Sequence, residues 1–424
     1  MQQAIVGAIF AATIVGLYVR PFGAKDWQVA LGGALLAWLA APLSLSGGVH
    51  VVGHSWNIIA FFLGLMLLSA GAEAAGLYEQ VASILRAHPP GRRRVAVVLV
   101  IGTGITAILS NDATPLVLTP AIFAADAGDS AGTMAGVPAA ALAATFAADG
   151  ASLLLPISNP VGLLFYQRFN LGLERYALHI LPAAAAGIVA LCLVTSLGAG
   201  HRPNHTPVTS RVATGLPSHV RSPGFATFAA IAVAGLAVAY VVAAGTGVPL
   251  GLVTLAGGFV LFAGAIASRS FDRERYRRQI SPGLLIFVGA LLVLVQAAAS
   301  AGLLHRLSDF FGYLDDQPAL LTIIGAALIA AVLSNLMNNW PAALVVAATI
   351  ALQPGQHDAL IVGSLIGCTI GANLTMVGSL STVFWLSLVR QEGGDISPAA
   401  YLRAASLPTI AALAAACAVA AITL

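Results

Sequence analysis

Runs of about 20 apolar residues recur along this 424-residue chain and constrain its fold more than any other feature. Those at 56–77, 179–199, 224–243, 283–303 and 404–424 are each long enough to span the hydrocarbon core of a bilayer. Only 8% of the residues are charged, against about 25% in soluble domains. A surface with so little charge must face lipid. The sequence therefore predicts an all-α polytopic membrane protein.

Several other classes of protein are not expected. The basic residues stand in separate short loops and form no stripe for nucleic acid. Cys192, Cys368 and Cys417 lie far apart in apolar runs, so neither a disulfide framework nor a metal site is predicted, and no cofactor is expected. The first segment, 4–19, lacks a positively charged leader and is interpreted as a retained helix.

The positions of the arginines predict the topology, because cytoplasmic loops collect Lys and Arg. The arginine-rich loops at 86–94 and 269–278 are placed inside, and 95–126 and 318–350 are treated as re-entrant hairpins. The protein is predicted to lie in the inner (plasma) membrane of the cell. Most basic residues are then on the cytoplasmic side, and both termini are outside. About ten transmembrane helices remain: 4–19, 27–43, 56–77, 137–167, 179–199, 224–243, 249–268, 283–303, 359–388 and 404–424.

Polar motifs that interrupt the apolar pattern recur at about half the chain length. "AILSNDATPLVLTPAI" (107–122) is followed by "LLLPISNPVGLLF" (153–165), and "SNLMNNWP" (334–341) by "GANLTMVGSLSTVF" (371–384). Matching the letters pairs Asn111 with Asn335 and Asn159 with Asn373. An odd number of crossings separates the copies, which predicts an inverted-topology repeat of the kind common in secondary transporters. The predicted units are 1–200 (hairpin 95–126, broken helix 137–167), a cytoplasmic linker at 201–223, and 224–424 (hairpin 318–350, broken helix 359–388).

These motifs combine helix breakers with hydrogen-bonding side chains. Pro115, Pro120, Pro156, Pro160 and Pro341 are expected to break helices. Non-helical backbone at membrane depth is tolerated only where it lines a cavity or is buried in protein. Two hairpin tips and two broken helices are therefore predicted to form a substrate site near the midplane, although any one such residue could instead bond packed helices together. The predicted substrate-binding residues are Ser110, Asn111, Thr114, Ser158, Asn159, Ser334, Asn335, Asn338, Asn339, Asn373, Thr375 and Ser379.

Three carboxylates fall inside predicted membrane segments, where an ionisable residue is a functional hypothesis by default. Asp149, in the first broken helix, and Asp112, at the first hairpin tip, are the candidates for proton coupling, with Asp149 ahead. Asp112 has an alternative role as the cap of the helix that follows it. Glu73, near the cytoplasmic end of 56–77, is interpreted as an interfacial or scaffold residue, because charged groups near helix ends can reach water.

The motifs resemble those of the arsenite efflux permease family (ArsB), within the ion transporter superfamily. "SNDATPLVLTP" is similar to that family's SNDGAALILTP, "SNLMNNWPAALV" to SNxMNNxPxxLV, and "GANLTMVGSLSTVFW" to GxNLTxxGSLATLLW. The first motif departs at 113–115, where the family has Gly-Ala-Ala. The resemblance implies export of arsenite and antimonite in exchange for protons, and optional partnership with a soluble ArsA-type ATPase. Related dicarboxylate carriers are homodimers that use an elevator-type motion, which leaves a homodimer open for this chain.

The chemistry of the motifs suits that substrate. Arsenite at neutral pH is mostly uncharged As(OH)3, and the motifs offer Asn, Ser and Thr without Lys or Arg. Capture by thiols would need several converging cysteines, and only Cys368 lies near a motif. The alternatives are a Na+/H+ antiporter, with Asn carbonyls and Asp112 as cation ligands, or a carboxylate carrier of the same superfamily. An enzyme is not expected, because no histidine lies mid-membrane to complete a catalytic pair.

Overall fold

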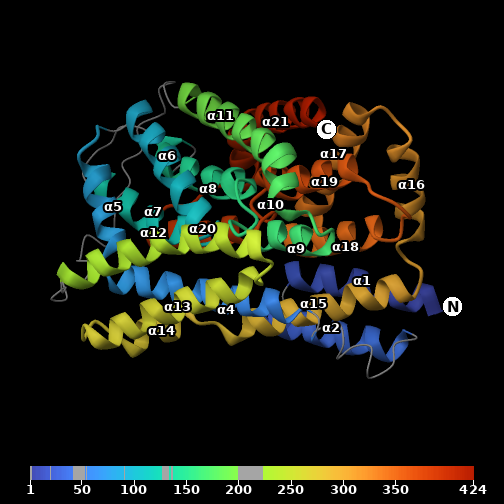
Figure 1. The fold of residues 1–424 in the computed structure, drawn as a ribbon, viewed down its shortest axis with the longest axis horizontal. Coiled ribbons are helices and arrows are strands. Elements are labelled where there is room, and N and C mark those ends of the chain that lie inside the picture. The colour runs from blue at the N-terminus through green and yellow to red at the C-terminus, as the bar shows by residue number, and fades with distance from the viewer. Residues whose placement is uncertain are drawn as a thin grey trace.

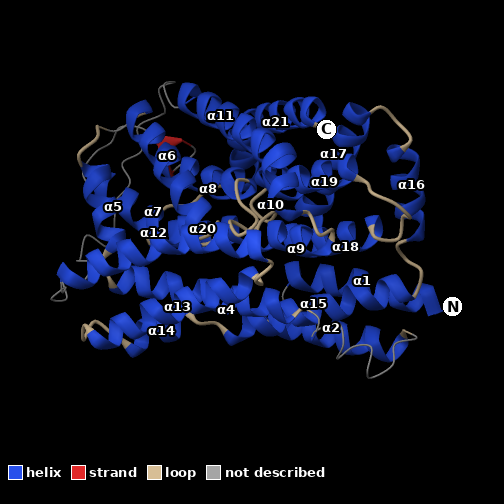
Figure 2. Ribbon diagram, in the orientation of Figure 1, coloured by secondary structure: helices blue, strands red, loops and turns tan. Residues whose placement is uncertain are grey.

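The computed structural model describes residues 2–19, 21–41, 53, 55–89, 91–126, 133–134, 137–198 and 223–424. Except for Pro223, the predicted linker at 201–223 lies outside these described residues. Helices make up almost all of the regular structure (Figures 1 and 2). The exception is a two-stranded antiparallel ribbon of β1 (Thr133–Met134) and β2 (Val137–Pro138). The predicted all-α class is confirmed, apart from this short ribbon.

Seven helical spans in the described part of the chain are long and apolar enough to cross a membrane. Large apolar side chains point away from the protein along them, such as Leu193 at 58% exposure and Ile410 at 57%. Because water would penalise this surface, lipid is its solvent, and the prediction of a multi-pass membrane protein is confirmed. The spans are Trp56–Ala74 (α4), Gly172–Gly198 (α10 to α11), Gly224–Ala243 (in α12), Leu250–Ala267 (α13), Pro282–Ser300 (α15), Ala319–Met337 (α17) and Pro398–Thr423 (α21).

The helices form two layers in the view of Figure 1. The lower layer contains α1 (Gln2–Val19), α2 (Asp26–Ala40), α4, α13 and α15, with α14 (Arg273–Gln279) below α13. Within it, α4 packs against α13 and α2 packs against α15, so each half of the chain contributes one member of each pair. A Cβ at Gly64 would lie 2.5 Å from the backbone of Thr254, so glycine is what lets α4 and α13 approach so closely.

The upper layer holds two copies of the same succession of elements, a helical hairpin followed by a broken helix. In the first half these are α6 (Arg92–Ile108), α7 (Ala113–Asp126), α8 (Ala139–Gly150), the 3-10 turn η2 (Ala151–Leu153) and α9 (Pro160–Arg168). In the second they are α17, α18 (Asn339–Ile350), α19 (Asp358–Thr369), the 3-10 turn η4 (Ile370–Leu374) and α20 (Leu380–Gln391). The polar motifs form the turns of the hairpins and the breaks in the helices, as the sequence predicted.

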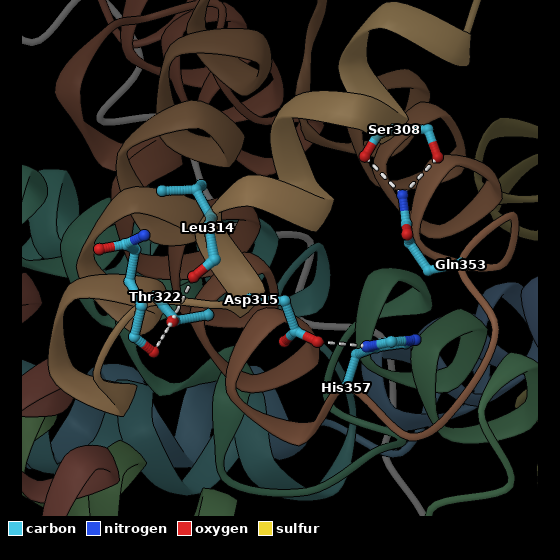
Figure 3. Close-up of polar contacts among 7 residues, drawn as sticks. Ser308, Leu314, Asp315, Thr322, Gln353 and His357 are labelled. Carbon is cyan, nitrogen blue, oxygen red and sulfur yellow. Dashed lines mark hydrogen bonds and ion pairs between the residues drawn. The ribbon is translucent and has the colours of Figure 1, made fainter.

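Two shorter helices stand at opposite ends of the molecule, α5 (Leu77–Arg86) and α16 (His305–Asp315) (Figure 1). The segment 304–317 joins the predicted helix 283–303 to the predicted hairpin 318–350, and most of it is α16 rather than an irregular loop. Figure 3 shows its polar attachments: Gln353 Nε2 donates to Ser308 Oγ (2.7 Å), and His357 Nδ1 lies 2.6 Å from Asp315 Oδ2. These contacts fasten α16 to the chain between α18 and α19.

The prolines do not all break helices as expected. Pro156 does lie in the break between η2 and α9. Pro160 is the first residue of α9, and Pro115 and Pro341 lie in the first turns of α7 and α18, where a missing N–H has no helical partner to lose. Pro120 lies inside α7, which continues through it, so the expected break there was wrong.

Candidate functional site

A buried carboxylate lies where the two halves of the upper layer meet. Asp149, at the end of α8, has no solvent exposure. Its Oδ1 accepts hydrogen bonds from Ser379 Oγ (2.7 Å) and Ser381 Oγ (2.6 Å), and its Oδ2 accepts one from Thr382 Oγ1 (3.0 Å). All three hydroxyls stand at the N-terminus of α20. A carboxylate of the first half is thus held by hydroxyl groups of the second half.

The tips of both hairpins approach this carboxylate. Asn111 Nδ2, from the first tip, lies 3.4 Å from Asp149 Oδ1, and Asn339 Nδ2, from the second, lies 3.4 Å from Ser379 Oγ. Asn373, in η4, donates to the carbonyl of Phe146, one turn before Asp149 (3.4 Å). The structure thus brings together several of the predicted site residues, while their role in binding stays a prediction. We call this group the Asp149 cluster: Asn111, Asp149, Asn339, Asn373, Ser379, Ser381 and Thr382.

The backbone repeats one contact in both halves. The N–H of Asn111 donates to the carbonyl of Ser158 (2.9 Å), and the N–H of Asn339 donates to the carbonyl of Gly378 (2.8 Å). Asn339 is therefore the counterpart of Asn111, and Ser379 that of Asn159. The letter matching with Asn335 and Asn373 was wrong, because α17 continues through Met337 and shifts the second tip along the chain.

Two amide oxygens of the cluster are buried without a hydrogen-bond partner in the described structure, Asn111 Oδ1 and Asn373 Oδ1. An unsatisfied buried acceptor costs about 1–3 kcal/mol. Both asparagines are at most 2% exposed, so the cluster is closed to solvent in this conformation. Together with the carboxylate of Asp149, these oxygens offer hydrogen-bond acceptors to a ligand rich in donors.

Asp112 does not cap α7. The hydroxyl of Ser110 accepts the hydrogen bond from the N–H of Ala113 (3.2 Å), whereas Oδ1 of Asp112 is buried without a partner among the described residues. The turn places Ser110, rather than Asp112, opposite the free N–H at the start of the helix. The capping alternative is therefore wrong, and a part for Asp112 in proton coupling stays a prediction.

Other predicted site residues bond within their own half. Asn335 Nδ2 donates to the carbonyls of Ala331 and Gly371 (both 2.8 Å), and its Oδ1 accepts from Thr375 Oγ1 (2.8 Å), which fastens α17 to η4. Asn159 accepts from the N–H of Val161 (2.9 Å) as the cap of α9. The remaining four have these positions: Thr114 bonds to Thr106 (2.7 Å), Ser158 to the carbonyl of Ala107 (3.3 Å), Asn338 to the carbonyl of Val377 (3.1 Å), and Ser334 is buried on α17.

Sequence reasoning missed Ser381 and Thr382. Both lie inside the quoted motif at 371–384, and Ser379 and Thr382 are three positions apart, on one face of the start of α20. Thr382 also bonds to Thr145 of α8 (3.2 Å), four residues before Asp149. The spacing of Ser379 and Thr382 on one helix face was the signal in the sequence that could have pointed to hydroxyl donors for a buried acid.

The other candidates lie away from the cluster. Glu73, near the end of α4, bonds to Gln279 of α14. Among the described residues, no group of three His, Cys, Asp or Glu side chains could hold a metal ion, and Cys368 is buried in α19. A cavity of about 350 Å3 opens between Arg168, Arg175 and the chain around 350–361. No residue of the Asp149 cluster lines it, and Arg175 there is already paired with Asp358 (2.6 Å).

Comparison with known proteins agrees with this architecture. The profile of the citrate transporter family (CitMHS) matches residues 24–367. Arsenical pump membrane proteins of Escherichia coli and Yersinia enterocolitica are each 30% identical over 96% of both chains. The crystal structure of the YdaH transporter of Alcanivorax borkumensis has a similar fold, with a TM-score of 0.54 at 15% identity over 93% of this chain and 96% of that one. The resemblance seen in the motifs is confirmed: the chain belongs to the citrate transporter (CitMHS) family and, within the membrane transporters, to the arsenical pump membrane protein (ArsB) type.

Proposed function

We propose that this chain is a secondary active transporter that exports arsenite and antimonite from the cytoplasm in exchange for protons. The observation that carries the proposal is Asp149, a fully buried carboxylate whose hydrogen-bond partners are neutral groups from both halves of the chain. The names of the arsenical pump relatives support the substrate.

The acceptors of the cluster fit As(OH)3. This molecule is neutral and carries three hydroxyl donors, so its site needs oxygen acceptors and no compensating charge. Asn111 Oδ1 and Asn373 Oδ1 are unpaired, and the Asp149 carboxylate can exchange a serine donor for a ligand hydroxyl. A citrate site would instead benefit from cationic partners.

Exchange follows if the proton and As(OH)3 compete for the same oxygens. A carboxylate accepts hydrogen bonds at both oxygens, whereas a protonated carboxyl loses acceptor capacity and becomes a donor. Arsenite from the cytoplasm would thus bind when Asp149 is ionised, and a proton from outside would favour its release. Because the Asp149 carboxyl cannot bind a proton and As(OH)3 equally well at the same time, each conformational cycle exchanges arsenite for a proton.

The cluster lies between the halves, which suits alternating access by an elevator-type motion of the upper layer past the lower one. In this proposal the protein stands in the inner (plasma) membrane with its basic loops in the cytoplasm and both termini outside. The hairpins return to the side they enter from. An ArsA-type ATPase and a second copy of the chain are optional partners.

A Na+/H+ antiporter or carboxylate carrier is the second candidate. The citrate transporter profile favours a carboxylate, and the unpaired amide oxygens are also of the kind that bind hard cations.

Everted vesicles distinguish these functions. With an inside-acid gradient, we expect concentrative arsenite uptake that a protonophore abolishes, and little movement of citrate or Na+. Asp149→Asn is expected to abolish uphill arsenite transport, and the weaker arsenite binding that persists should no longer change with pH, because the amide takes up no proton. Asp395→Asn is the matched control, because this carboxylate is 70% exposed. Gradient-driven Na+ or citrate movement without arsenite transport would replace the proposal by the second candidate.

A further inference from the structure

We infer that Ser381 and Thr382 are positioning residues that set how readily Asp149 takes up a proton, an inference that rests on the proposed proton exchange. The ionised and the protonated carboxyl make different hydrogen bonds in this cluster, and this difference affects how readily the proton binds.

Among the described residues, neutral groups alone donate to the ionised form: the hydroxyls of Ser379, Ser381 and Thr382, and the amide of Asn111 at 3.4 Å. The titratable groups that interact with it are Asp112 and Tyr401. Ser381 Oγ lies 2.6 Å from Oδ1 of Asp149, and Thr382 Oγ1 lies 3.0 Å from Oδ2. Both donors are fully buried, so no water replaces them. A buried carboxylate is costly unless such bonds compensate for its lost hydration, and bonds to an ionised acceptor are about twice as strong as neutral ones.

Thr145 fixes the direction of the Thr382 hydroxyl. Thr145 Oγ1 lies 3.2 Å from Thr382 Oγ1 and stands four residues before Asp149 on α8. When Thr382 donates to Asp149, its oxygen can accept the hydrogen of Thr145. Two contacts one turn apart therefore hold α8 against α20 and keep Thr382 pointed at the carboxylate.

Ser381 has a different property, because it can change from donor to acceptor. Its Oγ lies 2.9 Å from Ser379 Oγ. When a proton binds Oδ1 of Asp149, the new O–H can donate to Ser381 Oγ, and the hydroxyl of Ser381 can turn to donate to Ser379. The proton comes from hydronium at the outer side, so one O–H bond breaks there as the carboxyl O–H forms. The serine hydroxyls only rotate, and no buried donor of the carboxyl loses its partner. Ser379 then accepts the hydrogen of Ser381 and still has its own hydrogen to donate.

Removal of the Ser381 or the Thr382 hydroxyl should destabilise the ionised form of Asp149 more than its protonated form. Infrared difference spectroscopy of the full-length protein in lipid, titrated with acid and without arsenite, measures this directly. The carbonyl band of a protonated carboxyl that disappears in Asp149→Asn belongs to Asp149. We expect the pH midpoint of that band to rise in Ser381→Ala and in Thr382→Val, each by a roughly tenfold change in proton affinity.

Three further variants complete the test. Ser381→Thr and Thr382→Ser keep a hydroxyl and should stay close to the wild-type midpoint, which separates loss of the donor from general damage. Ser387→Ala, on the exposed side of the same helix, should leave the midpoint unchanged. If the Asp149 band keeps its midpoint in both Ser381→Ala and Thr382→Val, the positioning role is wrong while proton uptake by Asp149 stands. If no band depends on Asp149, the proton exchange itself is wrong, and the positioning role fails with it.

Discussion

Asn111 and Asn373 keep amide oxygens buried and unpaired, an arrangement that costs folding free energy unless a ligand uses the oxygens. Asn373→Ala should therefore raise the arsenite concentration for half-maximal transport roughly three- to tenfold, the value of one neutral hydrogen bond. The thermal stability of the protein should change little, because the removed oxygen made no bond and the amide nitrogen made only the long contact of 3.4 Å to the carbonyl of Phe146. Kinetics in everted vesicles and a melting curve check the two expectations, and an unchanged half-maximal concentration would remove Asn373 from the site.

Asn159 is the contrasting residue. Its Oδ1 caps α9 at the N–H of Val161, and its Nδ2 donates to Ser152 (3.1 Å), so both amide atoms are already engaged within the first half. Asn159→Ala should cost about 1 kcal/mol of stability, as loss of a helix cap does. Arsenite affinity, measured under conditions where the variant is folded, should stay at the wild-type value. A large loss of affinity at full stability would return Asn159 to the substrate site predicted from the sequence.

At the scale of elements, α17 and α19 pack through glycine. A Cβ at Gly367 would lie 2.1 Å from the carbonyl oxygen of Ala327, so Gly367→Ala must push the two helices apart. Overpacking of this kind costs about 1–3 kcal/mol, and the melting temperature in detergent should fall. Gly104→Ala on α6 is the control, since a Cβ there meets nothing within 4 Å. Equal melting temperatures for the two variants would show that the contact between α17 and α19 yields easily.

The sequence predicted the helical elements better than it predicted the contacts between them. Polar motifs with prolines and glycines in an apolar chain require buried breaks, so hairpin turns and broken helices followed from the sequence. The second tip was placed at Asn335 because its letters match Asn111, but apolar Leu336 and Met337 extend α17 and move the tip to Asn338 and Asn339. Ser381 was missed because a hydroxyl in an apolar helix usually forms a hydrogen bond between packed helices. Its partner, Asp149, is 232 residues away, and only tertiary packing brings them together.

At the scale of the whole molecule, an inverted repeat requires that corresponding ends of the two halves lie on opposite sides of the membrane. The arginine-rich α14 is predicted to be cytoplasmic and the acidic α16 external. Arg277 and Asp309 are both exposed on these helices, so cysteine can replace either one without entering the core. In intact cells a membrane-impermeant maleimide should label Asp309→Cys and leave Arg277→Cys unlabelled. In permeabilised cells both variants should be labelled. The unmodified chain controls for the native cysteines, two of which are buried. Labelling of both positions from outside would place α14 and α16 on one side. The helix between them, α15, would then not cross, and the two halves could not be inverted copies.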